Sequence, residues 1–360
     1  MDLIQNGEEG PGGHVSIVGL TAVPQNMSES EVTMNLELET YPPMFRQQNN
    51  QSSTHWKVIE PVRESELTIP VIDLHCLSPE ELGGACRDWG LFRLVNHGVP
   101  STLLRQLHEH AKELFSLSFE CKKKIFCSPL SYIWGTIATS PSGAAILTGP
   151  QNIHWVEGIH FPLGQLSQLQ PQDHMLASFG LLVEEYGRHL GRLGRTIFKT
   201  MAMELNLDPG ESETHLGEST GFLRVYRYPL RSMANSAWGI DVHTDSSVLS
   251  ILNQYEVGGL EVLKDNQWLQ VKPISDELIV NLGDMMQAIS NDKYKSVKHR
   301  VRLDKHRDRI SIGYFVFPEE GSVIRSSKYK PFTYGDFQAQ VHQDIKAHGF
   351  KVGLERFELT

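Results

Sequence analysis

The chain has 360 residues, of which 40% are hydrophobic and 21% charged, and its formal net charge is −10. This composition is typical of a globular protein with a sizeable core, and the acidic balance argues against a nucleic-acid-binding protein, which normally carries a basic surface. The sequence contains no run of about 20 apolar residues, which a membrane span would need, and its first residues lack a signal-peptide pattern. Its four cysteines are too few for a disulfide framework. We expect a monomer with reduced thiols in the cytoplasm, with the nucleus as the alternative, that binds neither nucleic acid nor a membrane.

The first 205 residues predict a polar extension followed by a domain of helices and strands. Residues 1–60 contain the low-complexity stretch RQQNNQSS and have little to bury, so we expect this extension to be partly disordered. Within 61–205, strands are predicted at IPVIDL (69–74) and LFRLVNHGVP (91–100), and helices at 78–90, 101–117 and 173–206. The last helix is the clearest, because its apolar residues recur at spacings of three and four.

From residue 206 the pattern changes to short β-rich segments separated by turn residues. Strands are predicted at FLRVYRYP, SVLSILNQ, LEVLKDNQWLQVKP, ELIVNLGD, KSVKHRVRL and RISIGYFVFP. Helices followed by six or more antiparallel strands indicate an α+β protein, and a double-sheet jelly roll backed by the N-terminal helices fits this order best. We expect this core to span 206–345, with 346–360 as a C-terminal tail.

The stretch HTDSSVLSIL raises the question of a metal site. His243 and Asp245 are two residues apart, so on a strand their side chains would point the same way, although a solvated turn explains such a pair equally well. In KSVKHRVRL, alternation places His299 between two valines on one face and three basic residues on the other. Because the basic face belongs in water, His299 is predicted to point inward, where a buried ring needs a partner. The alternative is a core histidine bonded to a backbone carbonyl.

Together, His243, Asp245 and His299 would supply two imidazoles and one carboxylate. This set is typical of an Fe(II) ion that is bound on one face and keeps positions open for substrates and oxygen. The alternative is a structural zinc in an inert jelly roll, but such a zinc normally has a fourth protein ligand, often cysteine. All four cysteines lie at or before residue 127, far from this cluster in sequence.

The segment RISIGYFVFP predicts a cation beside this metal. Alternation places Arg309, Ser311, Gly313 and Phe315 on one face of the strand. A buried guanidinium needs an anion and is matched to a carboxylate, to which a serine hydroxyl can also donate. If this face is inward, a dicarboxylate ligand is predicted. The alternative is an exposed arginine at a strand end, beside Asp308.

Three motifs in this order, HTDSSVLSIL, VNLGDMMQAISNDKYKSVKHRV and RISIGYFVFP, resemble the C-terminal half of the plant 2-oxoglutarate- and iron(II)-dependent dioxygenases. IPVIDL and DWGLFRLVNHGVP extend the resemblance upstream. It implies a double-stranded β-helix core and the oxidative decarboxylation of 2-oxoglutarate by O2, with ascorbate as the reductant and usually with hydroxylation of an unactivated C–H bond. The site residues that it implies are, for Fe(II), His243, Asp245 and His299 and, for 2-oxoglutarate, Arg309, Ser311 and Tyr228.

One motif departs from this family. Where the family usually reads Asn-x-Tyr-Pro-x-Cys, this chain has Tyr226 and Arg231 in place of the asparagine and the cysteine, while Tyr228 and Pro229 are kept. No iron ligand or carboxylate-binding residue is missing. A non-catalytic ligand-binding homologue is therefore disfavoured, and an oxidoreductase is expected.

The segment NIHWVEGIHFPL (152–163) resembles the Trp-x-Glu segment of gibberellin oxidases, especially the branch that acts on twenty-carbon gibberellins. This resemblance implies a rigid diterpenoid acid of plant hormone metabolism as the substrate, and hence a pocket with apolar walls and one cation. The candidate substrate contacts are Arg224, Trp155, Glu157 and Phe315. Trp155 is alternatively a core residue and Glu157 a partner of backbone amides. Flavonoids, auxin and other specialised metabolites are the alternative substrates.

Overall fold

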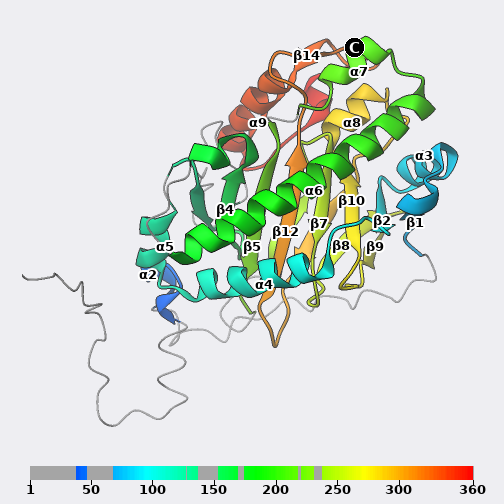
Figure 1. Cartoon of the computed structure of the whole chain (residues 1–360). Helices are drawn as coiled ribbons and strands as arrows, with labels where there is room; N and C mark the ends of the chain where they lie inside the picture. The colour runs from blue at the N-terminus through cyan, green and yellow to red at the C-terminus, as the bar shows by residue number, and fades with distance from the viewer. Residues whose placement is uncertain are drawn as a thin grey trace, which may run out of the picture.

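Two β-sheets, packed face to face, form the centre of the protein (Figure 1). The structure is a computed structural model that describes residues 38–46, 68–126, 128–136, 153–168, 174–217, 220–230 and 237–359. The predicted disorder of residues 1–60 falls largely outside the described residues, and so does Arg231.

The larger sheet has eight strands and the smaller sheet has four. In spatial order, the larger sheet consists of β1 (Val71–Asp73), β2 (Leu91–Val95), β10 (Leu278–Leu282), β7 (Leu249–Asn253), β12 (Arg309–Val316), β5 (Phe222–Tyr228), β4 (Glu157–Pro162) and β3 (Ser131–Trp134). The smaller sheet consists of β6 (Trp238–His243), β11 (His299–Arg302), β8 (Leu260–Lys264) and β9 (Gln267–Gln270). The strand pairs described in these two sheets are antiparallel except for β1 with β2. This confirms the α+β jelly-roll class.

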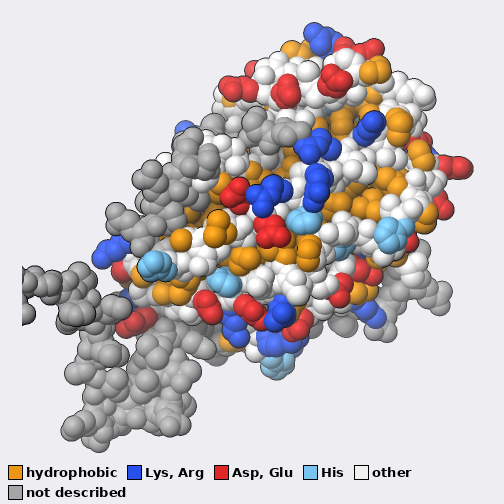
Figure 2. Space-filling model, viewed as in Figure 1, with side chains coloured by type: hydrophobic (Ala, Val, Ile, Leu, Met, Phe, Trp, Pro, Cys, Tyr) orange, Lys and Arg blue, Asp and Glu red, His pale blue; other side chains and the backbone are white. Residues whose placement is uncertain are grey.

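Helices cover the outer face of the larger sheet, where α6 (His174–Leu205) and α4 (Ser101–Ser116) run across the strands (Figure 1). The other α-helices are α2 (Pro43–Arg46), α3 (Pro79–Asp88), α5 (Phe119–Ile125), α7 (Pro209–Thr214), α8 (Asp284–Ile289) and α9 (Tyr334–His348), and β13 (Val323–Ile324) and β14 (Phe332–Thr333) form a small sheet. On this face, acidic and basic side chains lie next to each other between apolar ones (Figure 2). None of the helices in the described part of the chain is long and apolar enough to cross a membrane.

The main core lies between these helices and the larger sheet. The apolar stripe predicted for 173–206 is buried there, at Phe179, Val183, Tyr186, Leu190, Leu193, Ile197 and Met201 of α6. Strand β12 contributes Ile312, Tyr314 and Val316 to the same core. Because side chains alternate along a strand, Arg309 and Ser311 of β12 face the space between the two sheets. The predicted boundary near residue 205 is crossed by the pairing of β4 with β5 and stays a prediction.

The basic face of β11 lies on the outer surface of the smaller sheet. Arg300 stacks between Trp238 and Trp268, with its guanidinium carbon 3.9 and 3.8 Å from the two ring centres, and its Nε donates to Glu261 over 2.7 Å. The expectation that this face is simply solvated is therefore wrong for Arg300, because aromatic rings and a buried carboxylate take the place of water. The inward direction of His299, on the opposite face, is as predicted.

Candidate active site

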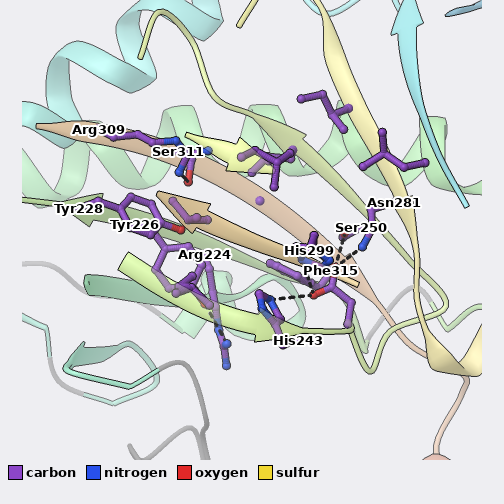
Figure 3. Close-up of a pocket in the computed structure, with 18 residues that line it drawn as sticks. Arg224, Tyr226, Tyr228, His243, Ser250, Asn281, His299, Arg309, Ser311 and Phe315 are labelled. Atoms are coloured by element: carbon purple, nitrogen blue, oxygen red, sulfur yellow. Dashed lines mark hydrogen bonds and ion pairs between the residues drawn. The ribbon is translucent and has the colours of Figure 1, made fainter. Parts of the chain in front are cut away.

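Three side chains carried by the smaller sheet and the loop after β6 converge at one point between the sheets, and Figure 3 shows the two histidines side by side. His243 is the last residue of β6, Asp245 follows in the loop, and His299 begins β11 as the register partner of His243. Oδ1 of Asp245 lies 3.9 Å from Nε2 of His243 and 3.7 Å from Nε2 of His299. One ligand atom from each residue lies within 4.8 Å of the others, so a single metal ion can contact all three.

Backbone carbonyl groups orient the two imidazole rings. Nδ1 of His243 lies 2.8 Å from the carbonyl oxygen of Asp241, and Nδ1 of His299 lies 3.1 Å from that of Val297. Because a carbonyl oxygen can only accept, each Nδ1 carries a proton and donates it. Each Nε2 lone pair is then left facing the point that the three residues share, which is how metal-binding histidines are usually held.

The carboxylate of Asp245 is oriented in the same way. Its Oδ2 accepts hydrogen bonds from Ser250 Oγ and Asn281 Nδ2, both over 2.8 Å, and this leaves Oδ1 for a metal. Neither Ser250 nor Asn281 was predicted as a site residue. The signal that could have found them is a polar residue among apolar ones on the buried strands β7 and β10.

The protonation of these groups suits metal binding. Burial is the main cause that lowers the pKa of His243, and the neighbouring His299 lowers it further. Burial opposes ionisation of Asp245, but the two histidines and the hydrogen bonds from Ser250 and Asn281 outweigh burial and lower the pKa of its carboxyl group. A neutral imidazole beside an ionised carboxylate is the state in which both bind a divalent metal.

Arg309 forms a cationic end of the same pocket. Its side chain is 1% exposed, and it donates to Ser311 Oγ over 3.1 Å and to Gln254 Oε1 over 3.4 Å. Its guanidinium carbon lies 4.7 Å from the centre of the Tyr228 ring. Its Nε has no hydrogen-bond partner, and among the residues that the structure describes no carboxylate pairs with it. Burial lowers the pKa of Arg309, yet a guanidinium stays charged in proteins. This donor set therefore fits the carboxylate of a small anionic ligand.

A pocket between the sheets connects the metal-binding point with Arg309 (Figure 3). Its apolar walls are made by Leu91, Ile240, Leu252, Leu260, Ile279, Val301 and Phe315. Arg224 and Tyr226 of β5 also line it, and Arg224 Nη1 donates to the hydroxyl of Tyr226 over 3.0 Å. The structure thus brings eight of the predicted site residues to one pocket, namely His243, Asp245, His299, Arg309, Ser311, Tyr228, Arg224 and Phe315.

The structure places Trp155 and Glu157 outside the lining of this pocket, which corrects the expectation that they contact the substrate. Trp155 is buried against Trp134 and Phe45, with ring centres 5.2 and 5.4 Å away. Glu157 lies on the helix-facing side of the larger sheet, where its carboxylate pairs with Lys122 at 2.6 Å and Arg227 at 2.8 Å. Side chains alternate between the two faces of the sheet along β4 and β5. Glu157 is the register partner of Arg227, which does not line the pocket, so its side chain lies on the other face.

We therefore expect Glu157→Gln to lower stability and to leave substrate binding intact. The side chain of Lys122 is 0% exposed and its ammonium group would lose its ionic partner, which costs about 3 kcal/mol in the free energy of unfolding. Urea unfolding measures this loss. The matched control is Glu184→Gln, which breaks an exposed pair with Arg188 and should change stability by less than about 0.5 kcal/mol. A normal stability with a raised KM for the substrate would restore the substrate-contact interpretation.

Known proteins resemble this chain in both halves. A family model described as the 2OG-Fe(II) oxygenase superfamily matches residues 219–318, and one described as the non-haem dioxygenase in morphine synthesis N-terminal matches residues 69–174. Gibberellin 2-beta-dioxygenases 6 and 5 of Oryza sativa subsp. japonica are 33% and 35% identical to it, covering 81% of this chain and 85% and 88% of their own lengths. The chain belongs to the 2OG-Fe(II) oxygenase superfamily. It is a dioxygenase that uses Fe(II), 2-oxoglutarate and O2.

Solved structures of other proteins share the fold. The crystal structure of JOX2 in complex with 2OG, Fe and JA has a TM-score of 0.69 and 26% identity, covering 87% of this chain and 96% of that one. The structure of a dioxygenase for auxin oxidation from rice has a TM-score of 0.65 and covers 81% of this chain and 100% of that one, at 24% identity. The second likeness shows the fold alone.

Proposed function

We propose that this dioxygenase oxidises a gibberellin-type diterpenoid acid, with His243, Asp245 and His299 holding Fe(II) and with Arg309, Ser311 and Tyr228 binding 2-oxoglutarate. The observation that supports the proposal is a single apolar pocket, which is lined both by this triad and by Arg309, a buried cation without a carboxylate partner among the described residues. When bound, iron and 2-oxoglutarate supply the oxidising chemistry, in which O2 converts 2-oxoglutarate to succinate and carbon dioxide and oxidises a C–H bond of the substrate.

The residues of the chain bind and orient the ligands of the pocket and exclude water from it. The fork of Arg309 is matched to a carboxylate, and Ser311 adjoins it, so a dicarboxylate held there is fixed in direction as well as in place. The hydroxyl of Tyr228 stays protonated, since burial raises its pKa to about 12, and can donate to the same ligand. The apolar walls keep water away from the substrate C–H bond, which limits side reactions.

Arg224 is the residue that we assign to the substrate carboxylate. It lies on the pocket side of β5, in the same row as Tyr226 and Tyr228, and its guanidinium carbon stacks 4.9 Å from the centre of the Phe222 ring. An acid with an apolar skeleton would place its carboxylate against this cation and its rings against the walls, with Phe315 among them. Relatives named gibberellin 2-beta-dioxygenase support this class of substrate.

The test is a substrate screen with the intact chain, Fe(II), ascorbate and 2-oxoglutarate. Twenty-carbon and nineteen-carbon gibberellins are compared with auxin and with a flavonoid, which has no carboxylate. We expect succinate release coupled to a product 16 mass units heavier or 2 lighter only with a gibberellin. Coupled oxidation of auxin or the flavonoid, with none of the gibberellins, would overturn the substrate assignment and leave the reaction class intact.

We expect Arg224→Met to weaken binding of the acid specifically. Loss of a charge-assisted hydrogen bond costs roughly 1.5–3 kcal/mol, so the KM for the acid should rise about tenfold to a hundredfold. The methyl ester of the same substrate lacks the anion and serves as the control, because the original chain and the variant should bind it equally. An equal rise in KM for acid and ester would contradict a carboxylate contact.

A further inference from the structure

Lys351, in the segment after α9, contacts the ligand loop, 243–248, which runs from the last residue of β6 to the start of β7 and includes the ligands His243 and Asp245. Its Nζ donates to the backbone carbonyl of Thr244 over 2.7 Å, to Asp284 Oδ2 over 2.7 Å and to Ser246 Oγ over 3.3 Å. All three donors of the ammonium group are therefore used. Thr244 is the residue between His243 and Asp245, so the contact is made between these two ligands.

Asp284, which Lys351 contacts, also contacts the segments that carry the ligands Asp245 and His299. Its backbone N–H donates to the carbonyl of Asp245 over 2.8 Å, and its Oδ1 accepts a hydrogen bond from Ser296 Oγ over 2.8 Å. Ser296 lies three residues before His299. The Asp284 carboxylate is buried and its ionic partner is Lys351, whose side chain is 15% exposed, so the two charges stabilise each other largely away from water.

After His243, the ligand loop has no strand pairing to hold it, so its position is set by the contacts described above. Strand β6 ends at His243, and β7 begins only at Leu249, so Thr244 and Asp245 have no place in a strand. Their carbonyl groups are instead held by Lys351 and by the N–H of Asp284. A metal site binds tightly when its ligands are already in place, and a free loop would have to be ordered by the metal.

We propose that Lys351 is a positioning residue, which holds the metal ligands His243 and Asp245 in place. The C-terminal segment thereby contributes to the active site. The inference rests on the proposed ligands. It gives a role to a residue of the predicted C-terminal tail, 346–360. Removing the ammonium group would free the carbonyl of Thr244 and would leave Asp284 as an unpaired anion beside Asp245. Both changes disturb the loop that carries His243 and Asp245.

The test measures binding of Co(II), as a stand-in for Fe(II), to the full-length protein by the visible absorption of the bound ion. Loss of a group that holds a metal ligand typically weakens metal binding by about 10- to 100-fold. We expect Lys351→Met to raise the dissociation constant for Co(II) by about tenfold or more, and Lys351→Arg to recover most of the loss. Lys346→Met is the matched control, since this exposed lysine lies on α9, and it should bind Co(II) normally.

Two further variants separate the outcomes. The double variant Asp284→Asn with Lys351→Met removes both charges of this pair, so it should fold even if the single variant does not, and should still bind Co(II) more weakly. His243→Ala tests the ligand assignment itself and should abolish the absorption. Normal Co(II) affinity in the Lys351→Met or the double variant, with loss in His243→Ala, would overturn the positioning role alone. Normal binding by His243→Ala would overturn the proposed site.

Discussion

Replacing Arg309 with methionine is expected to weaken the binding of 2-oxoglutarate strongly while leaving the cofactor-free protein at least as stable. The guanidinium is buried and has only neutral partners among the described residues, so its anion must come with the ligand. Truncation of a buried, hydrogen-bonded charge pair costs about 2–5 kcal/mol, or roughly thirtyfold to several thousandfold in affinity. We expect the KM for 2-oxoglutarate to rise within this range, measured by release of labelled carbon dioxide.

The stability of the same variant gives an independent readout. A buried cation without an anion is costly, and replacing it with an apolar side chain of similar length removes that cost. We expect the free energy of unfolding of the cofactor-free protein to rise by about 1 kcal/mol in Arg309→Met. Arg307→Gln, at an exposed position just before the strand, is the control and should change neither quantity. An unchanged KM for 2-oxoglutarate in Arg309→Met would remove Arg309 from the cosubstrate site.

Replacing His243 with alanine is expected to eliminate turnover by removing one of three metal ligands. Loss of a residue that merely orients a ligand costs about 10- to 100-fold, so the loss of a ligand itself should reduce succinate formation by more than roughly a hundredfold. Asp245→Ala should behave in the same way, because its Oδ1 is the oxygen that faces both Nε2 atoms. Succinate formation with Fe(II), ascorbate and 2-oxoglutarate is the measurement.

The control for these ligand variants is His306→Ala, an exposed histidine in the connection between β11 and β12, which should retain full turnover. Undiminished turnover in His243→Ala or Asp245→Ala would refute the iron assignment. Metal analysis of the purified protein adds a further check. Stoichiometric zinc with no consumption of oxygen would favour a structural zinc in an inert jelly roll.

Alternation along single strands was sufficient to predict much of the site. His299 lies between two valines and faces the pocket, and Arg309 and Ser311 share the inward face of β12, as the period of two requires. The spacing of apolar residues likewise predicted α6. These predictions concern which face of one element is buried, and this is a local property that a hydrophobic pattern specifies directly.

The predictions that failed concern the part of the protein against which each face is packed. Trp155 and Glu157 were expected in the pocket, yet Glu157 is buried on the opposite side of the sheet against Lys122 of α5. The sequence alone therefore determined α3, α4 and α6, many of the strands, and the inward direction of His299, Arg309 and Ser311. Only the tertiary structure decided that Lys351 contacts Thr244 across 107 positions and that Asn281 orients Asp245. The physical reason is that a buried charge needs a partner, but a local pattern cannot specify which distant element supplies it.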